Sequence, residues 1–321
     1  MDLGFERAGY SFKWACELDP NAAGIYKNHW PDVKLYANVT KMEAEHVEPV
    51  DVIIYGFPCT DISVAGVRSG IEMGKKSGLF FEALRLIRGI RPRIAMFENV
   101  FGLLSANEGR DFLVVLDCLA KIGYRTMWIT LDSRWFGVAQ RRRRVFGISA
   151  PETERGLVER IAAALQTLSD SMPRNVTKNW SGETDAESLE TGTGEAESDI
   201  EGKAVLESPA SGMFLGDYTW TLAVGGGKAG QGYQAVCVPE GKELVVRKLL
   251  PIEAERLQGW PDNHTQFRRV LKLNDNVWED ENREEAQKDS ERFAQCGNGV
   301  TSPVAEFLAK IVSKELNSKE K

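Results

Sequence analysis

The sequence predicts an α/β fold, a doubly wound and mainly parallel sheet followed by a second, smaller domain. Short apolar runs at 50–55, 93–97 and 124–131 have the length and composition of buried strands. Two stretches with helical periodicity, 78–89 and 110–122, separate these runs, and this alternation favours parallel strands with helices on both faces. The alternation stops near residue 150, which indicates a domain boundary.

The single elements follow from hydrophobic periodicity. Strands are expected over 12–18, 50–55, 93–97, 124–131 and 145–148. Helices are expected over 21–30, 78–89, 110–122 and 303–314. In the third of these helices, apolar residues recur at the spacing of one buried face, at Phe112, Val115, Leu116 and Leu119. The acidic stretch 279–291 is expected to form an exposed helix or loop.

Length and cysteine usage indicate a reduced, soluble protein. At 321 residues the chain can bury a large core and form two domains. It has no apolar run near the roughly 20 residues that span a membrane, and no secretion signal, so we expect a cytoplasmic protein without a membrane partner. The five cysteines lack paired spacing, which argues against a disulfide framework and a metal site.

The net charge of -7 is concentrated in one segment. Residues 179–202 carry eight acidic residues and no Lys or Arg, so we expect a disordered linker there. Because these eight charges are included in the total of -7, the rest of the chain carries +1. We expect a first domain over 1–150, a helix and linker over 151–203, a smaller domain over 204–292, and a terminal helix within 293–321 that returns to the first domain.

A cysteine follows the apolar run 50–55 at the place where open α/β sheets bind ligands. Gly56 and Pro58 end that strand abruptly and leave Cys59 at its carboxyl edge. A lone cysteine is more often a small buried residue than a nucleophile, so its neighbours decide. The next strand ends in Glu98-Asn99-Val100, which brings a carboxylate to the same sheet edge.

Two further blocks carry distinctive residues. The run Gln140-Arg141-Arg142-Arg143-Arg144 precedes the strand expected over 145–148, and alone it reads as a solvated basic patch or a phosphate contact. Arg142 and Arg144, two residues apart, share one face of an extended segment. A block over 247–261, with Leu250-Pro251 and Gly259-Trp260-Pro261, precedes Cys296-Gly297-Asn298-Gly299-Val300.

In this order, these blocks resemble the cytosine-5 DNA methyltransferase family, over about 3–150 and 215–312. The resemblance implies a class I methyltransferase-like sheet with a smaller target-recognition domain. It implies transfer of a methyl group from S-adenosylmethionine to carbon 5 of a cytosine that is flipped out of a specific double-stranded DNA sequence. We expect a monomer without a metal ion.

The implied chemistry gives four residues a catalytic role. Carbon 5 of cytosine becomes nucleophilic only after a nucleophile adds to carbon 6, and Cys59 is the candidate. Glu98 is expected to bind ring nitrogen 3 and to relieve the charge that develops there. Arg142 and Arg144 are expected to hold the base carbonyl and nearby backbone through their guanidinium groups.

The resemblance also implies cofactor contacts, from Glu17, Leu18, Asn38, Val39, Pro58, Leu79, Asn298 and Val300. Glu17 follows a strand and can accept hydrogen bonds from both ribose hydroxyls, with Leu18 against the adenine. Asn38 stands where the family usually has Asp. Two alternatives stay open, a helix-capping role for Glu17 and a core position for Leu79.

DNA contacts are implied for a second set, Ser63, Gln140, Arg141, Arg143, Thr221, Leu222 and Gly226. The stretch Thr219-Trp220-Thr221-Leu222, followed by glycines, resembles the segment with which the family reads bases. An ordinary glycine-rich hairpin fits the same residues. The family usually opens with a strand and a Phe-x-Gly-x-Gly-Gly turn, so we expect a truncated chain or a misassigned start. An RNA cytosine-5 methyltransferase and an inactive DNA-binding remnant are the alternatives.

Overall fold

The computed structural model describes residues 1–58, 78–171, 204–208, 212–216, 235–240 and 243–318. Its α-helices are α1 (Asp2–Arg7), α2 (Pro20–His29), α4 (Leu79–Ile90), α5 (Arg110–Lys121), α6 (Arg155–Ser171), α7 (Pro251–Leu257), α8 (Asp289–Asn298) and α9 (Ser302–Asn317). Short 3-10 helices are η1 (Val39–Lys41), η2 (Ala44–His46), η3 (Phe101–Leu104), η4 (Ala106–Gly109), η5 (Ser133–Phe136) and η6 (Glu152–Glu154).

The strands form three sheets in the described part of the chain. They are β1 (Trp14–Cys16), β2 (Lys34–Tyr36), β3 (Val52–Gly56), β4 (Ile94–Val100), β5 (Tyr124–Asp132), β6 (Arg143–Pro151), β7 (Ala204–Ser208), β8 (Gly212–Gly216), β9 (Ala235–Glu240), β10 (Glu243–Lys248), β11 (Phe267–Asn274) and β12 (Val277–Ala286). The predicted helices over 21–30, 78–89, 110–122 and 303–314 are confirmed as α2, α4, α5 and α9.

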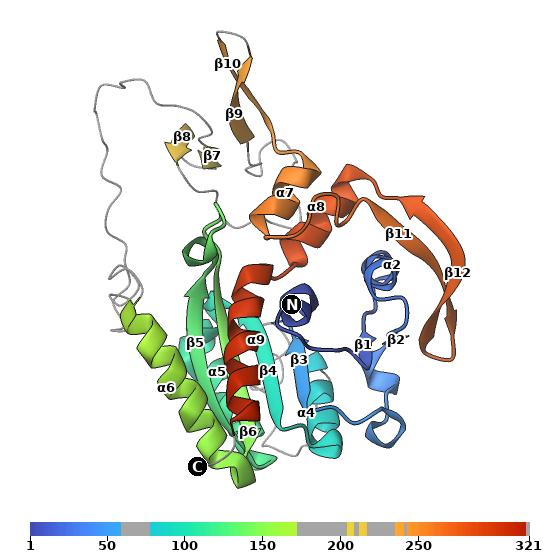
Figure 1. Ribbon diagram of the computed structural model, residues 1–321, viewed down its shortest axis with the longest axis vertical. Helices are drawn as coiled ribbons and strands as arrows, with labels where there is room; N and C mark the ends of the chain where they lie inside the picture. The colour runs from blue at the N-terminus through green and yellow to red at the C-terminus, as the bar shows by residue number, and fades with distance from the viewer. Residues whose placement is uncertain (59–77, 172–203, 209–211, 217–234, 241–242, 319–321) are drawn as a thin grey trace.

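The central sheet has the strand order β3-β4-β6-β5 (Figure 1). β3 and β4 are parallel, with Gly56 opposite Glu98 at their carboxyl ends. β6 runs antiparallel to both of its neighbours, β4 and β5. The connection 133–142 from β5 is too short for the crossover that a parallel pair would need. The predicted α/β class is confirmed, and β6 makes the sheet mixed.

Alternating side chains on β4 separate two apolar cores. Ile94 and Met96 pack with residues of α1, α6 and α9. Ala95 and Phe97 face the opposite way and pack with α4 and α5. A β-carbon at Gly147 of β6 would overlap the Phe97 ring, so only glycine leaves room for that ring. Helices therefore cover both faces of the sheet, as Figure 1 shows.

A second sheet has the order β1-β2-β12-β11. β1 and β2 are parallel, and the β11–β12 hairpin joins them through one antiparallel bridge from Val277 to Tyr36. Our expectation of a helix or loop over 279–291 was wrong for 279–286, which belong to β12, and α8 begins at Asp289. Opposite charges face each other across the hairpin and stabilise this pairing, since Arg268 lies 3.1 Å from Glu285 and Arg269 lies 2.8 Å from Asp280.

The third sheet has the order β10-β9-β7-β8 and is antiparallel. It belongs to the region that we expect to read DNA, and β10 leads directly into α7. The acidic segment 179–202 and the residues Thr221, Leu222 and Gly226 lie outside the described residues. Within the described ranges, no helix is long and apolar enough to cross a membrane.

Candidate active site

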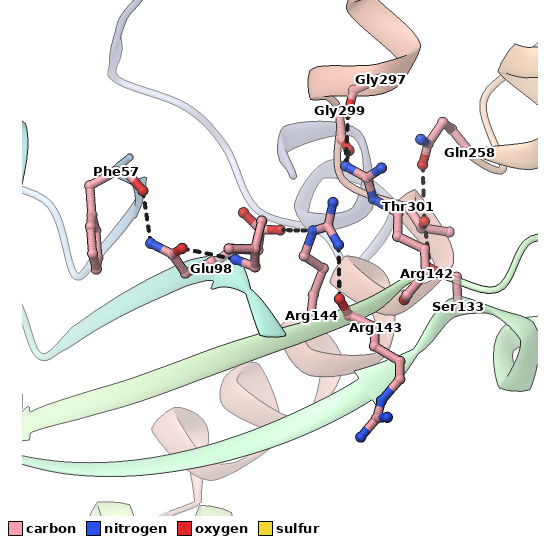
Figure 2. A network of polar contacts seen from close by, with 12 residues as sticks. Phe57, Glu98, Ser133, Arg142, Arg143, Arg144, Gln258, Gly297, Gly299 and Thr301 are labelled. Atoms are coloured by element: carbon pink, nitrogen blue, oxygen red, sulfur yellow. Dashed lines mark hydrogen bonds and ion pairs between the residues drawn. The ribbon is translucent and has the colours of Figure 1, made fainter. Parts of the chain in front are cut away.

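Glu98 and Arg144 form a shielded ion pair at the carboxyl end of β4 (Figure 2). Nε of Arg144 lies 3.0 Å from Oε1 of Glu98, and the two side chains are only 14% and 16% exposed. Burial raises the pKa of Glu98 above its ordinary value, although the positive charges of Arg144 and Arg142 act in the opposite direction. This carboxyl group therefore takes up a proton more readily than an exposed glutamate does.

Arg142 approaches the same carboxylate but is held by backbone. One guanidinium nitrogen donates to the carbonyl oxygens of Gly297 and Gly299, at 3.0 and 2.7 Å. Burial, assisted by the charge of Arg144, lowers the pKa of Arg142 to about 10. As predicted from their spacing, Arg142 and Arg144 lie on one side, and Figure 2 shows Arg143 directed to the other. Arg142 thus ties the end of α8 to the sheet.

The chain that leads to Cys59 is fixed next to Glu98. Nδ2 of Asn99, which is 3% exposed, donates to the carbonyl oxygen of Phe57 at 2.7 Å. A β-carbon built on Gly56 would lie 4.0 Å from Oε2 of Glu98. Cys59 and Ser63 lie outside the described residues. The described segment 1–58 nevertheless stops one residue before Cys59, at the edge of the sheet that carries Glu98.

A buried polar network behind Arg142 was missed by sequence reasoning. Asp132 is 1% exposed, and its Oδ1 accepts the backbone N–H of Arg142 at 3.1 Å. The hydroxyl groups of Ser133 and Thr301 lie 2.7 Å apart, and Thr301 donates to Gln258 at 3.0 Å (Figure 2). Asp132 could have been found from its position at the carboxyl end of an apolar strand, β5. Glu98 has the same kind of position on β4.

The remaining residues of the arginine run have different surroundings. Gln140 is fully buried, and its amide donates to the carbonyl oxygen of Leu257 at 2.9 Å. Its contact with DNA stays a prediction. Nε of Arg141 lies 3.9 Å from Asp132, and the Arg141 side chain is 45% exposed. The guanidinium carbon of Arg143 lies 3.9 Å from the centre of the Phe101 ring. Arg141 and Arg143 as DNA contacts stay a prediction.

Four of the expected cofactor residues lie at the carboxyl ends of β1 and β2. Glu17 follows β1, and its Oε1 accepts the backbone N–H of Asp19 at 2.8 Å. Burial raises the pKa of Glu17. Leu18 is 67% exposed. Asn38 caps the short helix η1, which begins at Val39, by accepting the backbone N–H of Thr40 at 3.0 Å.

These surroundings are compatible with a nucleoside. A half-buried carboxylate at a strand end can accept from ribose hydroxyls, and exposed apolar side chains at the same edge can pack on a purine. Leu18 supplies such a surface at this edge. Leu79, at the start of α4, is also exposed, at 44%. The open alternative of a core position for Leu79 does not agree with this exposure.

The other expected cofactor residues follow β3 or lie at the end of α8 and just after it. Pro58 is exposed at the end of the described chain, and Asn298 is the exposed last residue of α8. Val300 packs partly against the core of α9. Their contact with a cofactor stays a prediction. Among the described residues, no group of three or more His, Cys, Asp and Glu could hold a metal ion.

The profile of the C-5 cytosine-specific DNA methylase family matches residues 1–314. The chain therefore belongs to this family. The type II methyltransferase M.Bsp6I of Bacillus sp. (strain RFL6) is 38% identical over 148 residues, which are 46% of this chain and 47% of the relative. The type II methyltransferase M.NlaX of Neisseria lactamica is 24% identical over 326 residues, with 98% of this chain and 93% of the relative covered. The chain spans less than half the length of the first curated relatives.

Solved structures share the fold at low sequence identity. The DNMT2 structure from Spodoptera frugiperda has a TM-score of 0.57 at 13% identity, covering 97% of this chain and 96% of that one. The S. pombe Dnmt2 methyltransferase has a TM-score of 0.58 at 14% identity, covering 99% and 96%. These likenesses support the methyltransferase-like α/β class that the sequence predicts.

Proposed function

We propose that this protein methylates carbon 5 of a flipped-out cytosine in a specific double-stranded DNA sequence, with S-adenosylmethionine as methyl donor and Cys59 as nucleophile. The observation that carries the proposal is the Glu98–Arg144 pair at 3.0 Å, beside the end of the strand that leads to Cys59. Family membership supports the reaction type. We propose further that the protein acts as a soluble monomer in the cytoplasm of a bacterial or phage-infected cell.

In the proposed reaction, the Cys59 thiolate adds to carbon 6 and forms a sulfur–carbon bond. Electron density moves to carbon 5 and ring nitrogen 3, and the Glu98 carboxyl binds nitrogen 3 and supplies a proton. Its raised pKa favours this role, since the protonated form persists to a higher pH than in an exposed glutamate. Carbon 5 then takes the methyl group, and S-adenosylhomocysteine is the leaving group. Water accepts the carbon 5 proton, the proton on nitrogen 3 returns to Glu98, and the thiolate leaves carbon 6.

Two arginines support the carboxyl group in this proposal. Arg144 contacts Glu98 directly and has guanidinium N–H groups for the carbonyl oxygen of the base. Arg142 is a positioning residue, because its bonds to Gly297 and Gly299 fix the backbone next to Asn298 and Val300. Glu17, Leu18 and Leu79 would hold the nucleoside of the cofactor, which supplies an electrophilic methyl group when it is bound.

The direct test is a covalent adduct with double-stranded DNA that contains 5-fluorocytosine. With S-adenosylmethionine present, carbon 5 ends up carrying both the fluorine and the transferred methyl group. No proton is left there to remove, so the thiolate cannot be eliminated, and the trapped adduct migrates as a protein–DNA complex in a denaturing gel. We expect Cys59→Ser to abolish the adduct. Cys16→Ser is the matched control, because burial raises the pKa of the Cys16 thiol to about 12 and so keeps it protonated. An undiminished adduct in Cys59→Ser would place the nucleophile elsewhere.

Base flipping has its own measurement. Extrusion of a paired base costs a few kcal/mol, and less for a mismatched base. We therefore expect tighter binding to a duplex with a mismatch opposite the target cytosine, at one salt concentration with S-adenosylhomocysteine present. Binding should also weaken steeply with salt, since phosphate contacts release counterions. Equal affinity for the matched and mismatched duplexes would contradict flipping.

A further inference from the structure

The turn of the β11–β12 hairpin forms hydrogen bonds with the backbone that follows β2. The backbone oxygen of Asn276 accepts the N–H of Ala37 at 2.9 Å. Its side-chain Oδ1 accepts the N–H of Asn38 at 2.8 Å, and its Nδ2 donates to the Asn38 carbonyl oxygen at 3.0 Å. The side-chain amide thus takes the place of a further peptide group and extends the ladder of β2 beyond its last strand residue.

A second contact from the same hairpin reaches β1. Nε1 of Trp278 donates to the carbonyl oxygen of Glu17 at 2.8 Å. The backbone N–H of Glu17 in turn donates to Tyr36 of β2 at 3.0 Å. Asn276 and Trp278 together therefore hold the two chain segments that carry the expected ribose and adenine contacts.

Two features fix the position of the hairpin, a tight turn and close packing of β11 against α2. Asp275 and Asn276 have φ angles of +41° and +66°, as in the two-residue turns that match the twist of a β-hairpin. On the other side, β11 lies so close to α2 that a β-carbon at Gly24 would overlap the carbonyl oxygen of Arg269. Close docking and a tight turn fix where Asn276 meets Asn38.

We infer that the β11–β12 hairpin is a positioning element for the nucleoside half of the cofactor, with Asn276 and Trp278 as its positioning residues. The inference rests on the proposed use of S-adenosylmethionine. The hairpin orders the backbone of Glu17 and Asn38 before the ligand arrives, so the binding free energy is not reduced by the entropy cost of ordering these segments. A hairpin that only covered the open edge of β2 would not need a bond to Glu17, which follows β1 on the far side of β2.

The test uses the full chain and S-adenosylhomocysteine as the probe, with binding measured by calorimetry. Asn276→Gly removes both side-chain bonds and keeps the positive φ accessible. Asp275→Gly is the matched control, since it brings the same backbone freedom into the same turn. We expect the dissociation constant to rise about 10-fold for Asn276→Gly and less than about 2-fold for Asp275→Gly. Trp278→Phe, which keeps a ring but lacks the N–H, should also weaken binding.

Two further readouts separate the possible outcomes. Amide hydrogen exchange in the ligand-free protein should speed up at Ala37 and Asn38 in Asn276→Gly, and DNA binding without the cofactor should not change. Equal dissociation constants for the Asn276 and Asp275 variants, with normal binding by the parent chain, would overturn the hairpin's role alone. A parent chain that fails to bind S-adenosylhomocysteine would overturn both this role and the proposed cofactor.

Discussion

The β4–β6 corner and the β11–β12 hairpin both contain arginine–carboxylate pairs, and the two regions use them differently. At the corner, Arg144 and Glu98 are 14% and 16% exposed, and burial raises the pKa of the acid. On the hairpin, Arg268 and Glu285 are 23% and 38% exposed and lie opposite each other on paired strands. The pair distances are similar, at 3.0 and 3.1 Å.

Burial and placement, not distance, therefore distinguish the pair that we propose to be reactive from the pair on the hairpin. Water screens the hairpin charges, so their attraction contributes little beyond strand pairing. The corner pair is shielded from water, and this desolvation destabilises the charged carboxylate and favours its protonated form. It also lies where parallel strands end, which is where open sheets bind ligands. The following changes test this contrast.

The largest effect is expected for Glu98→Gln. The amide keeps the size of the side chain but cannot transfer a proton, and general acids contribute about 100-fold to 10,000-fold in rate. Because the pKa of Glu98 is raised, the parent rate should fall at high pH as this group ionises, and the variant should lose that falling limb. Methyl transfer to duplex DNA, measured across pH, checks this. A parent-like rate would exclude the assigned role.

The second-largest effect is expected for Arg144→Lys. Lysine keeps the positive charge but loses the planar guanidinium that contacts Glu98 and has further N–H groups for a base carbonyl. We expect methyl transfer to slow about 10-fold to 100-fold, with the fold intact. Arg268→Lys on the hairpin is the matched control, and it should leave the rate unchanged. Equal losses in both variants would remove the distinction between the two regions.

The sequence was informative where local pattern and sheet geometry agree. Apolar runs located β3 and β4, and the rule that strand ends meet at one edge brought Glu98 toward the chain that leads to Cys59. The two-residue spacing of Arg142 and Arg144 correctly predicted that both lie on one side of the segment, although it did not predict their proximity to Glu98.

Other parts depend on contacts that no local pattern contains. β12 is so rich in charged residues that it lacks the alternation of a half-buried strand, and its partners lie on another strand. Asn276 meets Asn38 across 238 positions of sequence. Gln140 stands in a basic run that suggests exposure, although its side chain is buried against Leu257. Such contacts are set by packing after the strands have paired.

Gly24→Ala tests how tightly the hairpin is docked. The added methyl group would overlap the Arg269 carbonyl oxygen and approach the Arg268 β-carbon at 3.1 Å, so α2 and β11 must separate. We expect a loss of about 1 to 3 kcal/mol in unfolding free energy, typical of overpacking. Denaturant unfolding measures it. Ala23→Gly on the same helix would be a poor control, because Ala23 is itself buried. Asn28→Ala, further along α2, is the better one.

The smallest effect is expected for the hairpin pair Arg269–Asp280, whose side chains are 26% and 24% exposed. A double-mutant cycle with Arg269→Gln and Asp280→Asn should give a coupling below about 1 kcal/mol, since partly solvated pairs gain little. The coupling should shrink further in 1 M salt, where the Debye length is about 3 Å. The rate of methyl transfer at saturating cofactor should stay as in the parent chain. A coupling several times larger, insensitive to salt, would mean that the hairpin pair is shielded like Glu98 and Arg144, and the contrast between the two regions would fail.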